Sequence, residues 1–326
     1  MTKKKRLLVI RFSAMGDVAM CVPVVREFLE QNPDTEIIFL SRPFFKPMFD
    51  DINGLSFFPV DLKIKYKGII GLYKLSKELK KTGFDEIADL HNVIRTKIIR
   101  LFLFSKKSAV LNKSRKERKQ LVRQKNKIRK QLKPMTERYT DVFRKLGYEV
   151  KLSNQLVNHQ VKENAIGIAP FAMYSGKTFP LSKMKAVALK IAENGTKVYL
   201  FGSKQEAEKL ENWENLNPNI ISVAGKYDLK KEFEIISGLK AMVSMDSANM
   251  HLASLVGTPV ISIWGTTHPF MGFLGYGQNY EDVIQDEKLI QRPTSVYGKE
   301  SKSAVSYDYF ESISPEMIVE KIQKYL

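Results

Sequence analysis

The sequence predicts an α/β protein built from two doubly wound parallel-sheet domains that face a cleft. Short apolar runs alternate with helical patterns along both halves of the chain, which is typical of parallel βαβ units. In each half one apolar run ends in an aspartate turn, at Gly16-Asp17 and at Met245-Asp246. At 326 residues the chain exceeds what one hydrophobic core usually serves, so we expect two domains.

The first domain is expected over residues 1–155. An apolar run predicts its first strand at residues 6–12, and Val22, Val25 and Phe28 recur at helical spacing. We expect further strands at residues 36–40, 57–60, 84–90 and 109–111, and helices at residues 18–31, 72–81, 93–104 and 136–146.

The second domain is expected over residues 156–312, after a link near residues 151–163 in which the regular pattern lapses. Ser182 is placed to cap a helix, and Ser314-Pro315 is a typical start for a terminal helix. We expect strands at residues 165–169, 197–201, 220–222, 241–244 and 259–264, and helices at residues 182–194, 205–215, 230–237, 248–256 and 316–326.

The net charge of +18 is concentrated in one segment. Residues 105–138 contain fourteen Lys and Arg against Glu117 and Glu137, so this basic segment carries +12 of the total. A few apolar residues among the charges predict one or two helices with a thin apolar stripe. The charge predicts an anionic partner.

Cysteine content and hydropathy indicate the cellular compartment in which the protein is found. Cys21 is the single cysteine, which excludes an internal disulfide and a Cys-rich zinc site and fits a reducing cytosol. The apolar run near the start ends at Arg11, too early for a signal peptide, and no run approaches the ~18 apolar residues of a membrane span. We expect a soluble, cytoplasmic protein.

Asp17 follows the first predicted strand, at the end of the strand where open α/β sheets bind ligands. It is either a helix-capping carboxylate or a general base facing the cleft. Ser13 and Met15 leave space around this turn, and Gly16 allows the backbone to approach a ligand closely. Gly16 is also the only glycine in the turn, so the dinucleotide-binding pattern G-x-G-x-x-G is absent.

Asp246 and Ser247 open a helix in the second half. They either cap that helix or belong to a site in which its free N–H groups bind a diphosphate. His251, one turn further on, is either structural or faces the same ligand. Lys177, in a glycine-containing loop without the Walker pattern, is either solvated or placed to neutralise phosphate. Glu206 is either a favourable charge at a helix start or a ribose contact.

Two further groups of polar residues follow strands. Thr266, Thr267 and His268 form a loop at the rim of the second domain. His91, Asn92 and Arg95 follow the strand at residues 84–90, on the side where an acceptor would bind together with Ser13 and Met15. The Cys, His and acidic residues show no metal-ligand spacing, so we expect no metal site.

Taken in order, these turns resemble glycosyltransferase family 9, the ADP-heptose:lipopolysaccharide heptosyltransferases. The resemblance covers nearly the whole chain except the basic segment and residues 285–312, and its most specific part is the block that begins at Asp246. It rests on RFSAMGDV at 11–18, SGKTFP at 175–180, GSKQE at 202–206, DSANMHLA at 246–253, GTPV at 257–260 and WGTTHP at 264–269.

The resemblance implies a GT-B architecture of two Rossmann-like domains, with the terminal segment 313–326 returning to the first domain. It implies that Asp17 is the base of an inverting sugar transfer and that Lys177 offsets charge on the departing nucleoside diphosphate, with no cofactor beyond the nucleotide sugar. The basic segment 105–138 would meet an anionic glycolipid at the inner-membrane surface. The implied donor contacts are Gly16, Ser175, Gly176, Thr178, Gly202, Glu206, Asp246, Ser247, Ala248, Asn249, His251, Thr266, Thr267 and His268.

Three alternatives stay open on the sequence. The enzyme could use another nucleotide sugar, or the chain could bind a sugar nucleotide without catalysis. A nucleic-acid-binding protein acting through the basic segment is the third, but that segment has no aromatic residue for base stacking until Tyr139 just beyond it.

Overall fold

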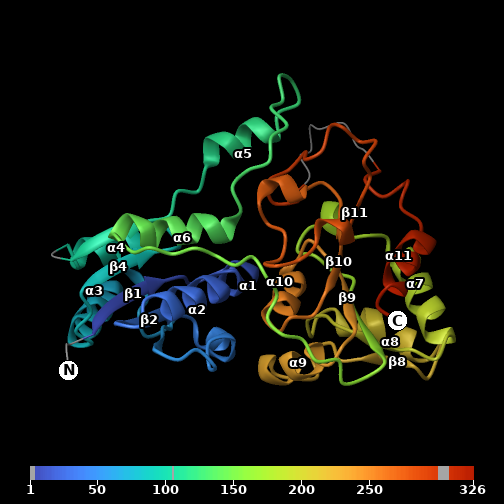
Figure 1. Ribbon diagram of the computed structural model, residues 1–326, viewed down its shortest axis with the longest axis horizontal. Coiled ribbons are helices and arrows are strands. Elements are labelled where there is room, and N and C mark those ends of the chain that lie inside the picture. Colours follow the sequence, from blue (N-terminus) through green and yellow to red (C-terminus); the bar gives the residue numbers. More distant parts are fainter. Residues whose placement is uncertain (1–3, 105, 300–307) are drawn as a thin grey trace. The chain divides into compact units, whose positions relative to one another are not determined.

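The computed structural model describes residues 4–104, 106–299 and 308–326, and its contacts divide the chain into two compact units (Figure 1). The first unit comprises Met1–Lys113 and Met135–Ser153, and the second comprises Ser114–Pro134 and Asn154–Leu326. Most of the basic segment therefore belongs to the second unit by its packing, although the sequence alone led us to assign it to the first domain.

The first unit is built on a five-stranded parallel sheet with the order β3-β2-β1-β4-β5. Its winding direction reverses beside β1, where β2 lies on one side and β4 on the other. The strands are β1 (Lys5–Ile10), β2 (Thr35–Ser41), β3 (Leu55–Pro59), β4 (Glu86–Asp89) and β5 (Lys107–Val110). The α-helices are α1 (Met15–Ala19), α2 (Cys21–Gln31), α3 (Gly68–Lys81), α4 (Ile94–Phe102) and α6 (Met135–Leu146).

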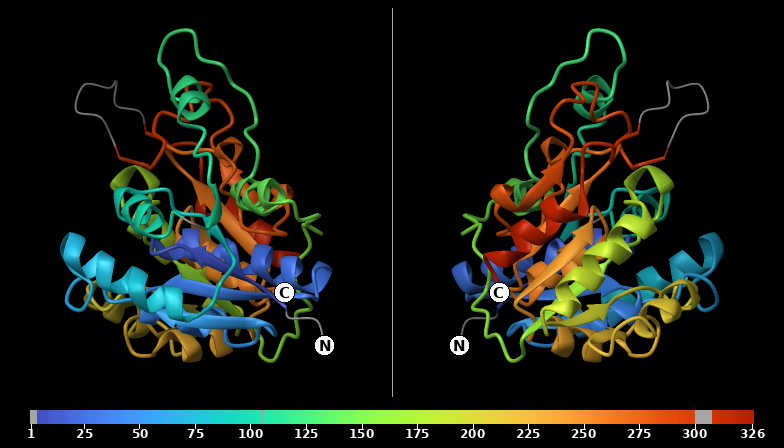
Figure 2. Two further views of the ribbon diagram at one scale, coloured as in Figure 1. Left: turned by 90° about the vertical axis from the view of Figure 1, so that its left-hand side faces the viewer. Right: turned by 90° about the vertical axis from the view of Figure 1, so that its right-hand side faces the viewer.

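Helices cover the sheet of the first unit and bury its apolar residues. Helices α3 and α4 lie side by side (Figure 2) and bury Leu72, Leu75 and Ile99 in one core cluster with Leu8 and Ile10 of β1. A second helix pair, α2 and α6, joins through the rings of Phe28 and Phe143, whose centroids lie 4.5 Å apart. Strand residues buried in this way read as continuous apolar runs, which is why the strands were visible in the sequence.

The second unit is built on a six-stranded parallel sheet with the order β11-β10-β9-β6-β7-β8, and its winding reverses between β6 and β9. Its strands are β6 (Ala165–Ala169), β7 (Lys197–Leu200), β8 (Ile220–Ser222), β9 (Ala241–Met245), β10 (Val260–Trp264) and β11 (Val283–Gln285). Its α-helices are α5 (Arg115–Leu121), α7 (Leu181–Glu193), α8 (Ala207–Glu214), α9 (Leu229–Ile236), α10 (Ala248–Leu255) and α11 (Pro315–Gln323).

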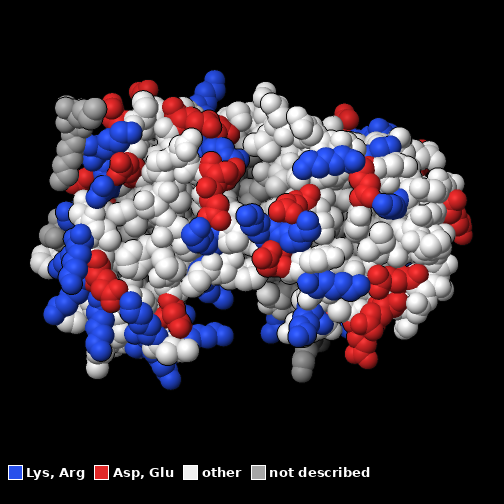
Figure 3. All heavy atoms as spheres, turned by 90° about the horizontal axis from the view of Figure 1, so that it is seen from below, with Lys and Arg blue, Asp and Glu red and all other residues white. Residues whose placement is uncertain are grey.

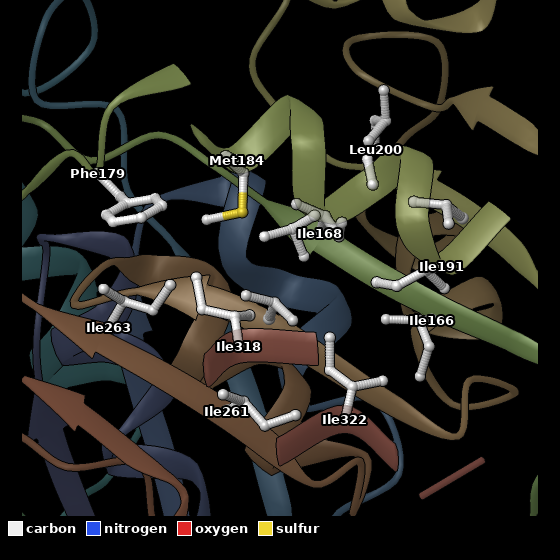
Figure 4. Packing of buried hydrophobic residues seen from close by; sticks show 14 of the residues in the cluster. Ile166, Ile168, Phe179, Met184, Ile191, Leu200, Ile261, Ile263, Ile318 and Ile322 are labelled. Atoms are coloured by element: carbon white, nitrogen blue, oxygen red, sulfur yellow. The ribbon is translucent and has the colours of Figure 1, made fainter. Parts of the chain in front are cut away.

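Helices α7 and α11 pack together on the sheet of the second unit (Figure 4). Met184 and Ile191 of α7 and Ile318 and Ile322 of α11 are all buried in the same core cluster. The resemblance led us to expect the terminal helix on the first domain. The structure instead buries its apolar stripe within the second unit, and Ser314 caps it by accepting a hydrogen bond from Met317 N at 3.4 Å.

The predicted elements differ from the described structure mainly in four places. The helix expected at residues 18–31 is two helices that meet at Met20. Of the described residues between β5 and α6, only Arg115–Leu121 form a helix, α5, because the like charges that follow Leu121 at helical spacing repel each other. Helix α7 already begins at Leu181, so Ser182 lies inside it and does not cap it. Strand β11 was not predicted.

Acidic and basic side chains are interspersed on the face shown in Figure 3. Among the helices of the described ranges, none has the length and apolar character needed to cross a bilayer.

The packing of α11 predicts a measurable contribution to stability. Ile318→Ala should lower the free energy of unfolding by about 2–5 kcal/mol, because it leaves a cavity in the core cluster. Met317→Ala is the matched control, since Met317 is exposed on the same helix, and it should change little. Urea unfolding measures both, and equal effects of the two substitutions would contradict this packing.

Candidate functional site

Asp17 lies in α1, directly after the carboxyl end of β1. Its Oδ2 atom is 2.6 Å from a guanidinium nitrogen of Arg11 and 3.3 Å from the backbone N–H of Ala14. The phenol of Tyr139, on α6, donates a hydrogen bond of 3.2 Å to its Oδ1 atom. These contacts orient the carboxylate. Because it is partly exposed, it is also reachable from solvent.

Arg11 and Tyr139 are buried partners of this carboxylate: Arg11 forms an ion pair with it, and Tyr139 donates a hydrogen bond to it. A second guanidinium nitrogen of Arg11 donates to the carbonyl of Leu90, after β4, at 2.6 Å. Burial opposes the charge of Arg11, but Tyr139 and Asp17 raise its pKa above the ordinary value. Burial also raises the pKa of Tyr139 well above its ordinary value, so this phenol stays protonated and donates. We did not anticipate either residue, although a charge directly after a buried strand could have indicated Arg11.

The residues predicted on the acceptor side lie at the ends of β1 and β4, two neighbouring strands of one sheet. His91 is buried, and its Nδ1 atom accepts a 3.4 Å hydrogen bond from Phe12 N. Asn92 is structural in this state: its side chain donates to the carbonyl of Leu111 at 2.9 Å. Arg95 is exposed on α4, and Ser13 and Met15 are partly exposed in the turn before Asp17.

The second candidate site is in the second unit, where the loop after β6 meets the turn after β9. Nζ of Lys177 is 2.9 Å from Oδ2 of Asp246, and both side chains are mostly buried, at 15% and 9% exposure. The hydroxyl of Thr267 donates to the same oxygen at 2.7 Å. The expectation that Lys177 and Asp246 share one edge of the sheet therefore agrees with the geometry.

A close backbone contact joins this pair to the loop after β10. Thr266 N donates to the carbonyl of Gly176 at 2.8 Å. A Cβ atom on Gly265 would lie 2.2 Å from that carbonyl oxygen, so only glycine fits there. Ser175 is exposed next to Gly176 in the loop after β6, and Thr178 donates to the carbonyl of Tyr174 at 3.3 Å.

Arg292 organises this loop, a role that is not predicted from the sequence. Its buried guanidinium donates to the carbonyls of Gly265 at 2.5 Å, Thr267 at 2.8 Å and Trp264 at 3.0 Å. Burial lowers the pKa of Arg292 to about 10, which leaves it charged at neutral pH. The carbonyls lie more than twenty residues away in sequence, so no local pattern indicates this role.

The remaining predicted donor residues are placed by α10 and by the turn after β7. Ser247 is the amino-terminal cap residue of α10, Ala248 and Asn249 lie in its partly exposed first turn, and His251 is buried. Glu206 uses one carboxylate oxygen to accept from both the backbone N–H and the hydroxyl of Ser203, at 2.7 and 2.8 Å. It thus fixes the turn at Gly202 in this state.

The basic segment reaches the rim of this site. A guanidinium nitrogen of Arg129 lies 3.5 Å from Nε2 of His268, and Nζ of Lys127 donates to the carbonyl of Pro293 at 2.7 Å. Leu132 N donates to the carbonyl of Phe270 at 2.8 Å. Within the described ranges, no cluster of three or more Cys, His, Asp or Glu side chains could hold a metal ion.

Comparisons with known proteins identify relatives. The model of glycosyltransferase family 9 (heptosyltransferase) matches residues 72–295. The chain is 24% identical over 284 residues to the lipopolysaccharide core heptosyltransferase OpsX of Haemophilus influenzae, which covers 81% of this chain and 80% of that protein.

Two solved structures show the fold. A glycosyl transferase family 9 protein from Veillonella parvula superposes with a TM-score of 0.75 at 16% identity, covering 100% of this chain and 98% of that one. The ADP-heptose lps heptosyltransferase II of Escherichia coli superposes with a TM-score of 0.72 at 18% identity, covering 98% of each chain. The predicted GT-B class with two Rossmann-like domains is confirmed.

The buried histidines at the two sites predict an acid-sensitive stability. Burial, followed by nearby arginines, lowers the pKa of both His91 and His268 from 6.5 to about 3. Between these two values the unfolded chain binds protons that the folded chain does not, so the free energy of unfolding should fall as pH falls through this window.

His268→Asn tests this directly, because the Asn oxygen can replace Nδ1 as acceptor for Phe270 N but does not titrate. Urea unfolding at neutral and mildly acidic pH should show a smaller acid loss for the variant than for the unmodified chain. An equal loss would show that His268 is not buried in its neutral form.

Proposed function

This chain belongs to glycosyltransferase family 9, the heptosyltransferase family, and from that membership we propose that it transfers heptose from ADP-heptose to an anionic lipopolysaccharide-type glycolipid. The chain is an enzyme, a glycosyltransferase. The donor and acceptor follow its relatives: OpsX is named for the lipopolysaccharide core, and the Escherichia coli enzyme for ADP-heptose. The observation that carries the mechanism is the presence of one aspartate-centred site at the point of reversed winding in each unit.

In the proposed reaction, Asp17 accepts the proton of the acceptor hydroxyl as the oxygen attacks the anomeric carbon. The bond between that carbon and the diphosphate oxygen breaks, ADP leaves, and the anomeric configuration inverts. A base must be ionised and fixed in direction, and the contacts of Asp17 support both. The pairing with Arg11 favours the charged carboxylate, while the hydrogen bond from Tyr139 fixes its plane.

The donor half of the proposal rests on Lys177 and on the start of α10. The lysine offsets the charge that develops on the departing diphosphate, and the free N–H groups of the first helical turn add a favourable field. In the structure Asp246 pairs with this lysine, and Thr267 donates a hydrogen bond to the same oxygen of Asp246. Positive charge placed in advance needs little rearrangement during the reaction, and it comes from the chain itself and not from a cofactor.

The basic segment supports an anionic acceptor presented at the inner-membrane surface, on the cytoplasmic side. Its excess of positive charge attracts phosphate-bearing headgroups, and this attraction acts over roughly a Debye length of about 8 Å at physiological salt. Arg129 and Lys127 of this segment lie against the loop that carries His268, so an acceptor held by the segment would be close to the donor unit.

A transferase that uses another nucleotide sugar is the remaining alternative with support. Residues 247–250 read SANM, and the sugar of the donor would lie near this turn. Side chains there select the sugar, whereas Lys177 and the helix start recognise a diphosphate of any nucleotide. A thermal-shift screen of ADP, UDP, GDP and their sugars separates these cases.

Replacement of the base gives the sharpest test of the mechanism. Asp17→Asn should leave binding of ADP-heptose nearly unchanged and lower the rate of transfer at least about a hundredfold, because it removes the proton acceptor. Asp50→Asn, on an exposed carboxylate of the same unit, is the matched control. Measured release of ADP at the unmodified rate by Asp17→Asn would refute the assignment.

Removal of the lysine charge tests the donor half. Lys177→Met should weaken ADP binding about tenfold or more, because a phosphate loses a charge-assisted contact. Lys190→Met is the control, since Lys190 forms an exposed ion pair with Glu316 in the same unit. Calorimetry measures both affinities, and unchanged binding by Lys177→Met would remove this residue from the site.

A further inference from the structure

The largest group of exposed apolar side chains that we find in the described part of the first unit lies on and beside α3 and α4. We name it the α3–α4 apolar surface. Its most exposed members are Phe104 at 83%, Ile64 at 82% and Ile94 at 75%. Its residues are Ile64, Ile69, Ile70, Tyr73, Ile94, Leu101 and Phe104.

Core packing does not account for these side chains. The inner face of α3 already buries Leu72, Leu75 and Leu79 against the sheet, and Ile99 does the same for α4. Both helices are therefore apolar on two faces, and only one face has a partner within the unit. Surface helices normally carry polar residues opposite the core, so the second apolar face indicates a second partner.

The two helices that carry most of the exposed members are in contact. The ring of Tyr73 on α3 meets the ring of Phe102 on α4 edge to face, with centroids 5.3 Å apart. Figure 1 and Figure 2 show the two helices side by side. Residues Ile94 and Leu101 are seven apart and so project from one side of α4.

The turn before α3 presents its apolar residue in a fixed position. Oδ1 of Asp61 accepts hydrogen bonds from the backbone N–H groups of Lys63 and Ile64, at 2.8 and 3.0 Å. Tyr66 is buried and donates to Glu78 of α3 at 2.6 Å. The turn is thus anchored, and Ile64 is held out to solvent between two lysines.

Basic side chains surround the α3–α4 apolar surface. Nζ of Lys77 lies 4.7 Å from the centre of the Tyr73 ring. Other exposed cations alternate with the apolar residues along the turn and the two helices: they are Lys63, Lys67, Lys74, Arg95 and Lys97. Apolar residues surrounded by lysine and arginine match the interface of an anionic bilayer. There the acyl chains accommodate apolar side chains, and the headgroup phosphates attract the basic ones.

The surface also borders the proposed acceptor site. Strands β3 and β4 are parallel to β1, so the starts of α3 and α4 lie at the carboxyl edge of the sheet that also carries Asp17 and His91. A bilayer in contact with Ile64 and Ile94 would therefore meet the first unit at the edge where the acceptor hydroxyl must reach its base.

We propose that the α3–α4 apolar surface docks the first unit on an anionic lipid bilayer, by insertion of its apolar side chains between headgroups. This inference rests on the proposed function for its biological purpose, since the acceptor is a glycolipid. The surface is separate from the basic segment, and apolar insertion differs from charge attraction because salt does not screen it.

The test is co-sedimentation of the full chain with vesicles of phosphatidylcholine, with and without phosphatidylglycerol, at low and high salt. The triple variant Ile70→Gln, Ile94→Gln, Phe104→Gln should lower partitioning onto anionic vesicles by about tenfold at both salt levels. The matched control is Val161→Gln, Leu216→Gln, Tyr227→Gln, which removes three exposed apolar residues from the second unit and should bind as the unmodified chain does.

A third variant separates this surface from the basic segment. Lys116→Gln, Lys119→Gln, Lys125→Gln should weaken vesicle binding at low salt and leave the salt-resistant part unchanged. Transfer to a delipidated, water-soluble acceptor reports the proposed function independently, and the triple apolar variant should keep its full rate. If the unmodified chain does not transfer heptose to this acceptor, the proposed function is refuted, and the vesicle-binding results are then judged by themselves.

Two results would overturn the inference. One is equal partitioning of the triple apolar variant and the unmodified chain. The other is that the triple apolar variant binds vesicles as the unmodified chain does but no longer self-associates in the ultracentrifuge, which would make the surface a protein interface.

Discussion

Every strand of a parallel sheet ends at the same edge, and the loops after two strands diverge where the winding direction reverses. This constraint places the candidate sites of both units. In the first unit it brings Asp17, after β1, close to His91, after β4. In the second it brings Lys177, after β6, into an ion pair with Asp246, after β9. Neither site requires residues that are close in sequence.

A buried arginine stabilises a loop at each of the two candidate sites. Arg11 donates to a carbonyl after β4 and pairs with Asp17, so one side chain ties together both loops of the first unit. Arg292 donates to the carbonyls of Trp264, at the end of β10, and of Gly265 and Thr267 in the loop that follows, and Thr267 donates to Asp246. A buried backbone carbonyl without a hydrogen-bond partner would lower the free energy of unfolding. The two cations thus keep the loops in one conformation, as preorganised sites require.

The sequence predicted the fold class and the strand ends well, because buried parallel strands are continuous apolar runs. It located Asp17, Lys177 and Asp246 through that regularity. It could not predict the roles of Arg292 and Tyr139, whose partners lie on other elements far along the chain. It also could not show that Glu206 satisfies Ser203, or that α11 packs on α7, since both depend on tertiary packing.

We propose that the chain transfers a sugar with inversion, from a donor held by Lys177 and the start of α10 to a hydroxyl activated by Asp17. The most direct measurement is the nuclear magnetic resonance spectrum of the product formed from ADP-heptose and a delipidated acceptor. We expect ADP release together with a heptosyl product whose anomeric configuration is opposite to that of the donor. A product with the configuration of the donor would contradict the proposal, because a single attack assisted by one base cannot retain configuration.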